Sequence, residues 1–315
     1  MQRSIMTTPV IIDCDPGHDD VFALWLAAGN PEIDLLGVTT VGGNGRLEHT
    51  THNARVALTV AGVEGIPIAA GADKPLRREL TPATWIHGDN ALGGPVLPEP
   101  TVPLDERSAI DLITDLLESS TEPVTLIPTG PLTNIAMLLE QRPHLRDRIK
   151  EIIWMGGSTG RGNVGAYPEF NAWVDPEAAA AVFAAGLPLT MVGLNISHQA
   201  LITADVIESI GAIGNETSAF GVELLRFFCS TYDEVEGMAE GPLHDPITVA
   251  IAIDRAVATI QRSHVDVETS GEFTSGATAV DLHDMLRKEP NADIAITLDV
   301  DRFWDLIRNA VASLR

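Results

Sequence analysis

The sequence predicts an α/β fold with an open, mostly parallel (mixed) central sheet and helices on both of its faces. Short apolar runs alternate with segments of helix length along most of the chain. This alternation is typical of parallel sheets built from strand–helix–strand units. With 315 residues, 45% of them hydrophobic, the chain can bury a large core. Since no repeat or linker interrupts it, we expect one domain over residues 1–315.

Apolar periodicity predicts the helices and strands, and glycine and proline residues mark where they end. Gly29-Asn30-Pro31 is expected to stop the first helix, because glycine and proline end helices. The expected strands begin at Val10 and cover residues 35–41, 66–69, 124–127, 151–155, 189–192, 265–268 and 292–298. The expected helices cover 21–28, 48–61, 108–118, a stretch from 132, 177–185, a region ending near 229, 246–253 and 301–314.

Three irregular segments interrupt this alternation. Residues 71–105 are rich in proline and glycine, and residues 158–176 also lack a regular pattern. Structureless segments of this length are usually lids or binding loops. A shorter polar loop is expected over residues 232–241.

The charge of the chain limits its partners. Lys and Arg number 20 against 44 Asp and Glu, which gives a formal net charge of −24. This balance argues against nucleic acid and anionic membrane surfaces and suits a neutral ligand or a metal cation. No leader segment or 18-residue apolar run is found, so a cytoplasmic protein is expected, with Met6 as an alternative start. Cys14 and Cys229 are expected to be reduced.

Four carboxylates lie within eight residues at the end of the first strand. The stretch reads Asp13-Cys14-Asp15-Pro16-Gly17-His18-Asp19-Asp20. Two acids could be explained by the dipole of the helix that follows, but four exceed what it can balance. A hard divalent cation with oxygen ligands is the simplest compensation. Asp13 is expected to brace the loop rather than bind the cation.

Other polar residues also follow strands. Asn44, Thr129, Asn163 to Asn171 and His244-Asp245 would meet the acidic turn at the carboxyl edge of a parallel sheet. This set contains no lysine or arginine, so it favours a polyhydroxy ligand over a phosphate.

The acidic turn, Asp13 to Asp20, resembles the signature of the inosine-uridine-preferring nucleoside hydrolases. The resemblance extends beyond the acidic turn, in family order, over nearly the whole chain. Its further blocks are Gly43-Asn44, Ile86-His87-Gly88, Pro128 to Asn134, Met155-Gly156-Gly157, Glu169-Phe170-Asn171, Asp175 to Ala179 and His244-Asp245-Pro246.

The resemblance implies calcium-dependent hydrolysis of the N-glycosidic bond of ribonucleosides on the nucleoside-hydrolase fold. Asp15, Asp20, Asp245 and the backbone carbonyl of Thr129 would hold Ca²⁺, which would also bind the attacking water and the ribose hydroxyls. Asp15 would be the general base. The family also implies a homodimer or a homotetramer.

The resemblance also implies roles around the substrate. His244 and His87 would be the candidates for protonating the departing base, and Tyr232 would lie near the base. The residues expected to contact the ribose are Asp19, Asn44, Met155, Asn163, Glu169, Asn171 and Asp245.

The sequence departs from the family pattern around the base. Gly88-Asp89-Asn90 follows His87 where relatives more often have Gly-Glu, and Gly45 follows Asn44 where glutamine is common. The blocks at 97–100 and 241–246 look most like pyrimidine-preferring relatives. We therefore expect uridine or cytidine before inosine.

Three other functions share parts of this pattern. A phosphatase of the haloacid-dehalogenase type also begins with Asp-x-Asp, but Gly17 replaces its usual threonine or valine, and no phosphate-binding lysine is evident. An EF-hand fails because His18 and Leu24 occupy positions that need glycine and glutamate. A catalytically inactive ribose-binding protein on the same fold remains open.

Overall fold

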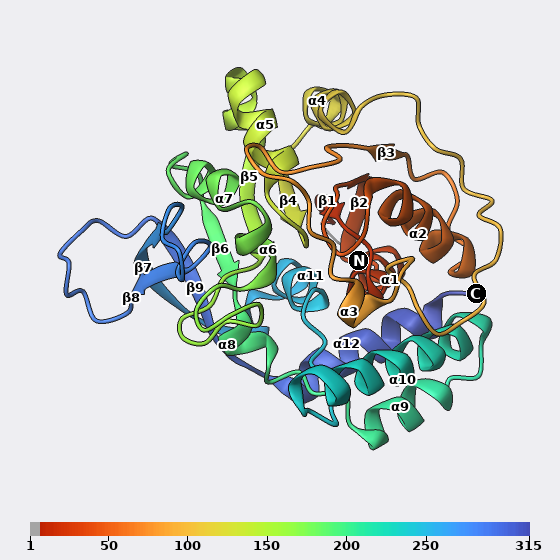
Figure 1. Cartoon of the computed structure of the whole chain (residues 1–315). Helices are drawn as coiled ribbons and strands as arrows, with labels where there is room; N and C mark the ends of the chain where they lie inside the picture. Colours follow the sequence, from red (N-terminus) through yellow and green to blue (C-terminus); the bar gives the residue numbers. More distant parts are fainter. Residues whose placement is uncertain (1–6) are drawn as a thin grey trace, which may run out of the picture.

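The computed structural model describes residues 7–315 and contains one nine-stranded sheet (Figure 1). The strand order is β3-β2-β1-β4-β5-β6-β9-β7-β8. The strands are β1 (Thr8–Cys14), β2 (Ile33–Thr40), β3 (Ile68–Ala70), β4 (Val124–Pro128), β5 (Ile149–Met155), β6 (Leu189–Val192), β7 (Ala258–Val267), β8 (Thr278–Asp281) and β9 (Ala292–Leu298).

The pairing within this sheet confirms the predicted mixed, mostly parallel arrangement. β3 through β6 and then β9 pair in parallel, whereas β7 runs antiparallel to both β9 and β8. The chain passes from β1 to β2 on one side and later returns to β4 on the other. Ligands bind at such a switch point in open α/β sheets, at the carboxyl ends of the strands.

Helices cover both faces of the sheet. Alternate residues of β1 show this directly, because Val10 and Ile12 belong to one buried cluster and Ile11 belongs to the other. The first cluster contains residues of α1 (His18–Gly29), α2 (Leu47–Val60), α9 (Ala204–Gly211), α10 (Glu216–Glu236), α11 (Pro246–Ile253) and α12 (Val300–Ser313). The second contains residues of α4 (Ala109–Ser119), α5 (Thr133–Gln141) and α7 (Pro176–Phe183).

One predicted segment is wrong in a way that matters for the site. Residues 232–236 were expected in a polar loop, but they form the last turn of α10. Phe228 and Tyr232 are four residues apart, so both face inward from this helix and are buried. The helix ends where Gly237 adopts a left-handed φ of 68°, which glycine tolerates best.

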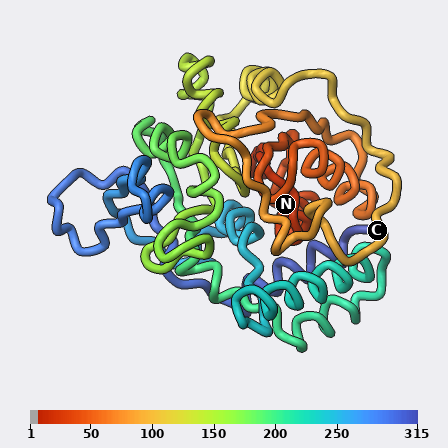
Figure 2. The backbone as a smooth tube through the Cα atoms, in the orientation of Figure 1, coloured from red at the N-terminus to blue at the C-terminus, as the bar shows by residue number. Residues whose placement is uncertain are grey.

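Several short elements, inside and outside the irregular segments, were not predicted from the sequence pattern. The helices α3 (Thr84–His87), α6 (Phe170–Val174) and α8 (Leu194–Ser197), the 3-10 turns η1 (Pro143–Arg148) and η2 (Arg255–Val257), and strand β8 were all missed. Each is six residues or shorter, below the length at which periodicity is informative. Figure 2 shows the later part of the excursion over 71–105, after α3, passing outside α2. Arg55 of α2 fixes it there by donating to the Val102 carbonyl at 2.7 Å.

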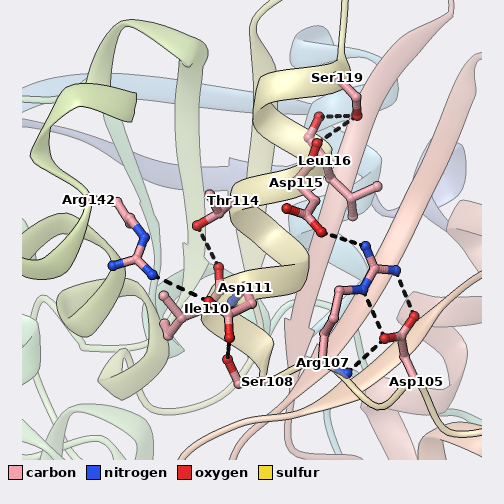
Figure 3. A network of polar contacts seen from close by, with 10 residues as sticks. All are labelled: Asp105, Arg107, Ser108, Ile110, Asp111, Thr114, Asp115, Leu116, Ser119 and Arg142. Carbon is pink, nitrogen blue, oxygen red and sulfur yellow. Dashed lines mark hydrogen bonds and ion pairs between the residues drawn. The ribbon is translucent and has the colours of Figure 1, made fainter.

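Polar contacts hold the end of that excursion to α4 (Figure 3). Arg107 pairs with Asp105 at 2.7 Å and with Asp115 at 2.8 Å. Ser108 caps α4 by accepting the Asp111 backbone N–H at 3.2 Å. These exposed groups secure the chain before β4 and lie on a different element from the polar strand ends described below.

No helix within residues 7–315 is long and apolar enough to cross a membrane. Cys14 and Cys229 are free, as expected. Met6, the possible alternative start, lies outside the described residues.

Candidate active site

The turn between β1 and α1 is organised by the carboxylate of Asp20. Its Oδ1 accepts the Asp15 backbone N–H at 3.2 Å and the Thr129 hydroxyl at 2.7 Å. Its Oδ2 accepts the Gly17 N–H at 3.0 Å and the Asn44 amide at 3.3 Å. Asp20 therefore joins the carboxyl ends of β1, β2 and β4 at the switch point of the sheet.

The two oxygens of Asp15 have different surroundings. Oδ2 accepts the Asn44 backbone N–H at 2.6 Å, while the buried Oδ1 has no hydrogen-bond partner within the described residues. Gly43 and Gly130 lie against this carboxylate so closely that a Cβ at either position would overlap it. An unpartnered buried carboxylate oxygen is costly unless a proton or a cation compensates it.

Asp19, Asp20 and Asp245 come together beside Asp15. One oxygen from each of these three lies within 4.8 Å of the other two, and all three side chains are buried. Asp19 was expected at the ribose rather than in this group. Burial raises the pKa of Asp19 to about 7, and burial also raises the pKa values of Asp20 and Asp245.

The donor set fits a hard cation. Four buried carboxylates have no Lys or Arg among the residues that line the cavity above them. For Asp15, burial raises the pKa well above its usual range, and the neighbouring Asp20 charge raises it further. A divalent cation would allow the group to ionise together, and all the donors are oxygen, as Ca²⁺ and Mg²⁺ prefer.

Asp13 is hydrogen-bonded through one of its two oxygens. Its Oδ1 accepts the Thr39 hydroxyl at 2.6 Å and the Asn134 amide at 2.8 Å, which ties β1 to β2 and to α5. Burial raises its pKa to about 6. Asp13 thus stabilises the turn through its contacts with β2 and α5.

Three residues after β5 form the opposite wall. Glu169 caps α6 and accepts three backbone N–H groups, including that of Gly157 at 2.8 Å. Burial raises its pKa to about 7. Asn171 donates to the carbonyls of Thr129 at 2.8 Å and Met155 at 3.0 Å. Asn163 accepts the Phe170 N–H at 2.9 Å, which leaves its amide NH₂ free for a ligand.

A second polar cluster lies where α10 meets the loop before α11. The Tyr232 hydroxyl is 2.7 Å from Nε2 of His244, and Nδ1 of His244 is 2.8 Å from Oγ of Ser197. Burial lowers the pKa of His244 well below its usual range and raises that of Tyr232. His198, beside them, is partly buried, and burial lowers its pKa to about 4.

One cavity gathers nearly all the expected site residues. The cavity is open to solvent. Asp15 and Asp20 are buried and do not line it. The expected residues that line it are Asp19, Asn44, His87, Thr129, Met155, Asn163, Glu169, Asn171, Tyr232, His244 and Asp245.

Sequence reasoning missed several apolar lining residues and one acid. These are Ala83, Trp85, Ile86, Val164, Phe170, Phe228 and Glu236. Phe228 and Tyr232 are spaced i, i+4 and share one face of α10. A predicted helix that continued past residue 229 to include Tyr232 would have indicated Phe228 as well. Trp85 and Ile86 directly precede His87, so the motif itself pointed to them.

The comparisons with known proteins decide the family. The family model described as inosine-uridine preferring nucleoside hydrolase matches residues 10–305. The chain belongs to this family. The resemblance read from the sequence is therefore confirmed, and family membership supports hydrolysis of ribonucleosides.

Relatives and solved structures of this family agree over nearly the whole chain. The inosine-uridine preferring nucleoside hydrolase of Leishmania major is 45% identical over 309 residues, covering 97% of this chain and 98% of that protein. The pyrimidine-specific ribonucleoside hydrolase RihA of Salmonella paratyphi A is 44% identical, covering 96% and 97%. The purine-preferring ribonucleoside hydrolase of Gardnerella vaginalis superposes with a TM-score of 0.90 at 30% identity, covering 97% and 98%. These matches confirm the nucleoside-hydrolase fold.

Proposed function

We propose that this chain is a calcium-dependent hydrolase of the N-glycosidic bond of ribonucleosides, with Asp15 as the general base. The observation that carries the proposal is the buried cluster of Asp19, Asp20 and Asp245 at the cavity, beside which Asp15 Oδ1 has no hydrogen-bond partner within residues 7–315. Family membership supports the reaction class, and the donor chemistry supports the cation.

Asp15, Asp20, Asp245 and the Thr129 carbonyl are the residues that would hold Ca²⁺. When bound, the cation lowers the cost of deprotonating water and orients the ribose hydroxyls. Asp20 is pre-positioned by contacts from three strand ends. Asn171 orients the peptide of Thr129 by donating to its carbonyl.

Asp15 would take the proton of the attacking water. The Asn44 N–H fixes Oδ2, so the carboxylate cannot rotate freely, and Oδ1 is left for this task. Without a metal, burial raises the pKa of Asp15, and a bound cation would allow this carboxyl to ionise.

The cavity wall would stabilise positive charge on the ribose as the glycosidic bond breaks. Glu169, Asp19 and Asp245 supply negative charge, while Asn44, Asn163 and Asn171 supply amide groups for the hydroxyls. Met155 would pack against the sugar ring. The absence of Lys and Arg from this lining favours nucleosides over nucleotides.

The departing base would receive its proton from the pair of Tyr232 and His244. Their contact at 2.7 Å joins a phenol that burial keeps protonated to an imidazole that burial keeps neutral. His87, the other candidate in the sequence, lines the same cavity.

Pyrimidine nucleosides are the proposed substrates, with inosine next. The RihA relative is named pyrimidine-specific and the Leishmania major relative inosine-uridine preferring. A homodimer or homotetramer is proposed as the assembly.

Ribose release from uridine, cytidine, inosine and adenosine tests the proposal directly. The panel is run with a calcium chelator, and then with calcium or magnesium added back. We expect chelator-sensitive release that calcium restores, fastest with uridine or cytidine. Stable binding of nucleosides without any release would instead favour a catalytically inactive binding protein.

A further inference from the structure

One residue of the acidic turn has no part in the chemistry above. His18 begins α1, is fully buried and does not line the cavity. Its ring stacks against His87 and Phe227, both with centroids at 5.2 Å, and against Phe228 at 5.3 Å. His87 does line the cavity, so His18 lies directly behind a residue that faces the substrate.

The contacts of the two histidines determine where their protons lie. Nε2 of His18 is 2.9 Å from the Gly93 carbonyl, which can only accept, so Nε2 carries the hydrogen. A neutral imidazole has one N–H, and Nδ1 of His18 is therefore a bare acceptor. That nitrogen is 3.0 Å from Nδ1 of His87, which must then be the donor.

Both rings are neutral in this arrangement. Neither has a carboxylate within ion-pair distance among residues 7–315, and both are buried among aromatic rings. The backbone N–H of His18 also approaches Nδ1 of His87, but at the longer distance of 3.4 Å. If that contact made His87 Nδ1 the acceptor, two lone pairs would face each other at 3.0 Å.

We propose that His18 is a positioning residue that holds His87 in the Nδ1–H tautomer, so that Nε2 of His87 presents a lone pair to the nucleobase. His87 then accepts a hydrogen bond from an N–H group of the base and does not donate a proton. The inference rests on the proposed function, because it assumes a base in this cavity.

Neighbouring residues hold the side chains of His18 and His87 in contact. A Cβ at Gly17 would lie 2.5 Å from the His87 ring, so glycine makes room for it. Asn53 holds the turn after His87 by donating to the Asn90 carbonyl at 2.9 Å. The acceptor role of His87 also leaves the proton transfer to Tyr232 and His244.

Nitrogen NMR of the calcium-loaded, ¹⁵N-histidine-labelled protein tests the tautomer directly. The His87 ring signals are assigned by their loss in His87→Gln. We expect Nδ1 of His87 to show the shift of a protonated nitrogen and Nε2 that of a bare nitrogen. A protonated Nε2 in the wild type would overturn the inference, whether or not the protein hydrolyses nucleosides.

Kinetics separate positioning from a structural role. His18→Phe keeps the ring stack and removes the acceptor, whereas His18→Asn places an amide oxygen near the position of Nδ1. We expect His18→Phe to lower kcat/KM about tenfold on the best nucleoside, roughly the effect of one neutral hydrogen bond, and His18→Asn to restore most of it. A nitrophenyl riboside, whose leaving group has no N–H, should be nearly unaffected.

Equal losses on both substrates in His18→Phe would show that the acidic turn itself had been disturbed and would overturn the positioning role. Failure of His18→Asn to recover any activity on the nucleoside would do the same. If the wild type released ribose from no nucleoside, the proposed function would fail, and the NMR result would still decide the tautomer.

Discussion

At the scale of single residues, the two oxygens of Asp15 have different surroundings. Oδ2 is satisfied by Asn44 and Oδ1 is not. Asp15→Asn keeps the size of the side chain but removes the base and weakens a cation ligand. We expect the fold and much of the ribose affinity to persist while kcat falls roughly 10²- to 10⁴-fold. Stopped ribose-release assays and ribose binding by calorimetry measure the two quantities.

Asp34→Asn is the matched control for this variant, because Asp34 lies exposed on β2. It changes the same functional group and the same net charge, and it should turn over at the wild-type rate. Near-normal turnover in Asp15→Asn would exclude Asp15 as the general base.

The next prediction concerns the hydrogen-bonded side chains of Tyr232 and His244. His244→Ala and Tyr232→Phe each break their 2.7 Å contact. If the pair protonates the departing base, both variants should lose about 10²-fold or more on a nucleoside and far less on a nitrophenyl riboside, which needs no proton. Parallel measurements of kcat on the two substrates check this, and equal losses on both would argue against a leaving-group role.

The residue types of the site could be predicted from the sequence, but many of their contacts could not. The acids of the turn, Asn44 and Thr129 were readable because they follow strands that end at one edge. His244 and Asp245 were also expected after a strand, but they lie between α10 and α11. The contact of His18 with His87 joins residues 69 positions apart, and that of Ser197 with His244 joins residues 47 apart. No local pattern encodes either distance, since both depend on how α1, α10 and the loops pack.

At the scale of elements, the core strands were predicted from the sequence, whereas short elements and helix ends were not. A polar loop was predicted over residues 232–241, yet α10 continues to Glu236, and Phe228 and Tyr232 pack inward on one face of it. Tertiary packing overrode local composition. The core strands needed no such information, because their apolar runs are buried on both faces.

Two glycines that follow strands lie against the Asp15 carboxylate. Gly43, after β2, and Gly130, after β4, enclose the Asp15 carboxylate without room for a methyl group. Gly43→Ala or Gly130→Ala should therefore displace the carboxylate, weaken calcium binding and cost about 1–3 kcal/mol of unfolding free energy. Calcium titration and chemical denaturation measure these effects.

Gly160→Ala is the control for crowding, because a Cβ there meets nothing within 4 Å. It should leave calcium affinity unchanged. Wild-type calcium affinity in both Gly43→Ala and Gly130→Ala would mean that Asp15 does not need this enclosure.

For the whole molecule, the buried acids make stability depend on pH when no metal is bound. Asp19 and Glu169 have pKa values raised to about 7, against usual values of 3.8 and 4.5, so the folded state holds protons that the unfolded state has released. Their contribution to stability is lost as pH rises through about 7. Burial lowers the pKa of His18 from its usual 6.5 to about 4, so this residue makes stability increase with pH. It does so only below about pH 6.5.

The chelated protein should therefore lose stability as pH rises from about 6.5 to about 7.5, by at most about 1.4 kcal/mol per pH unit for each such proton. The contribution of these two groups should level off above about pH 7, because the folded state then releases the same protons. Urea unfolding at several pH values measures this slope. Asp19→Asn removes one of these groups and should flatten it. A chelated wild type whose stability rises over this interval would contradict the raised pKa values.

Calcium should reverse that loss, because binding requires the carboxylates to be ionised. Added to the chelated protein, calcium at about 100 times its Kd should raise the unfolding free energy by about 2.7 kcal/mol, and the gain from a fixed concentration should be larger at pH 8 than at pH 6.5. Thermal unfolding with calcium or magnesium added separately measures the gain and compares the two ions. Asp20→Asn should lose most of it, while Asp34→Asn should retain it. An equal gain in Asp20→Asn and in the wild type would place the bound calcium elsewhere on this strongly acidic chain.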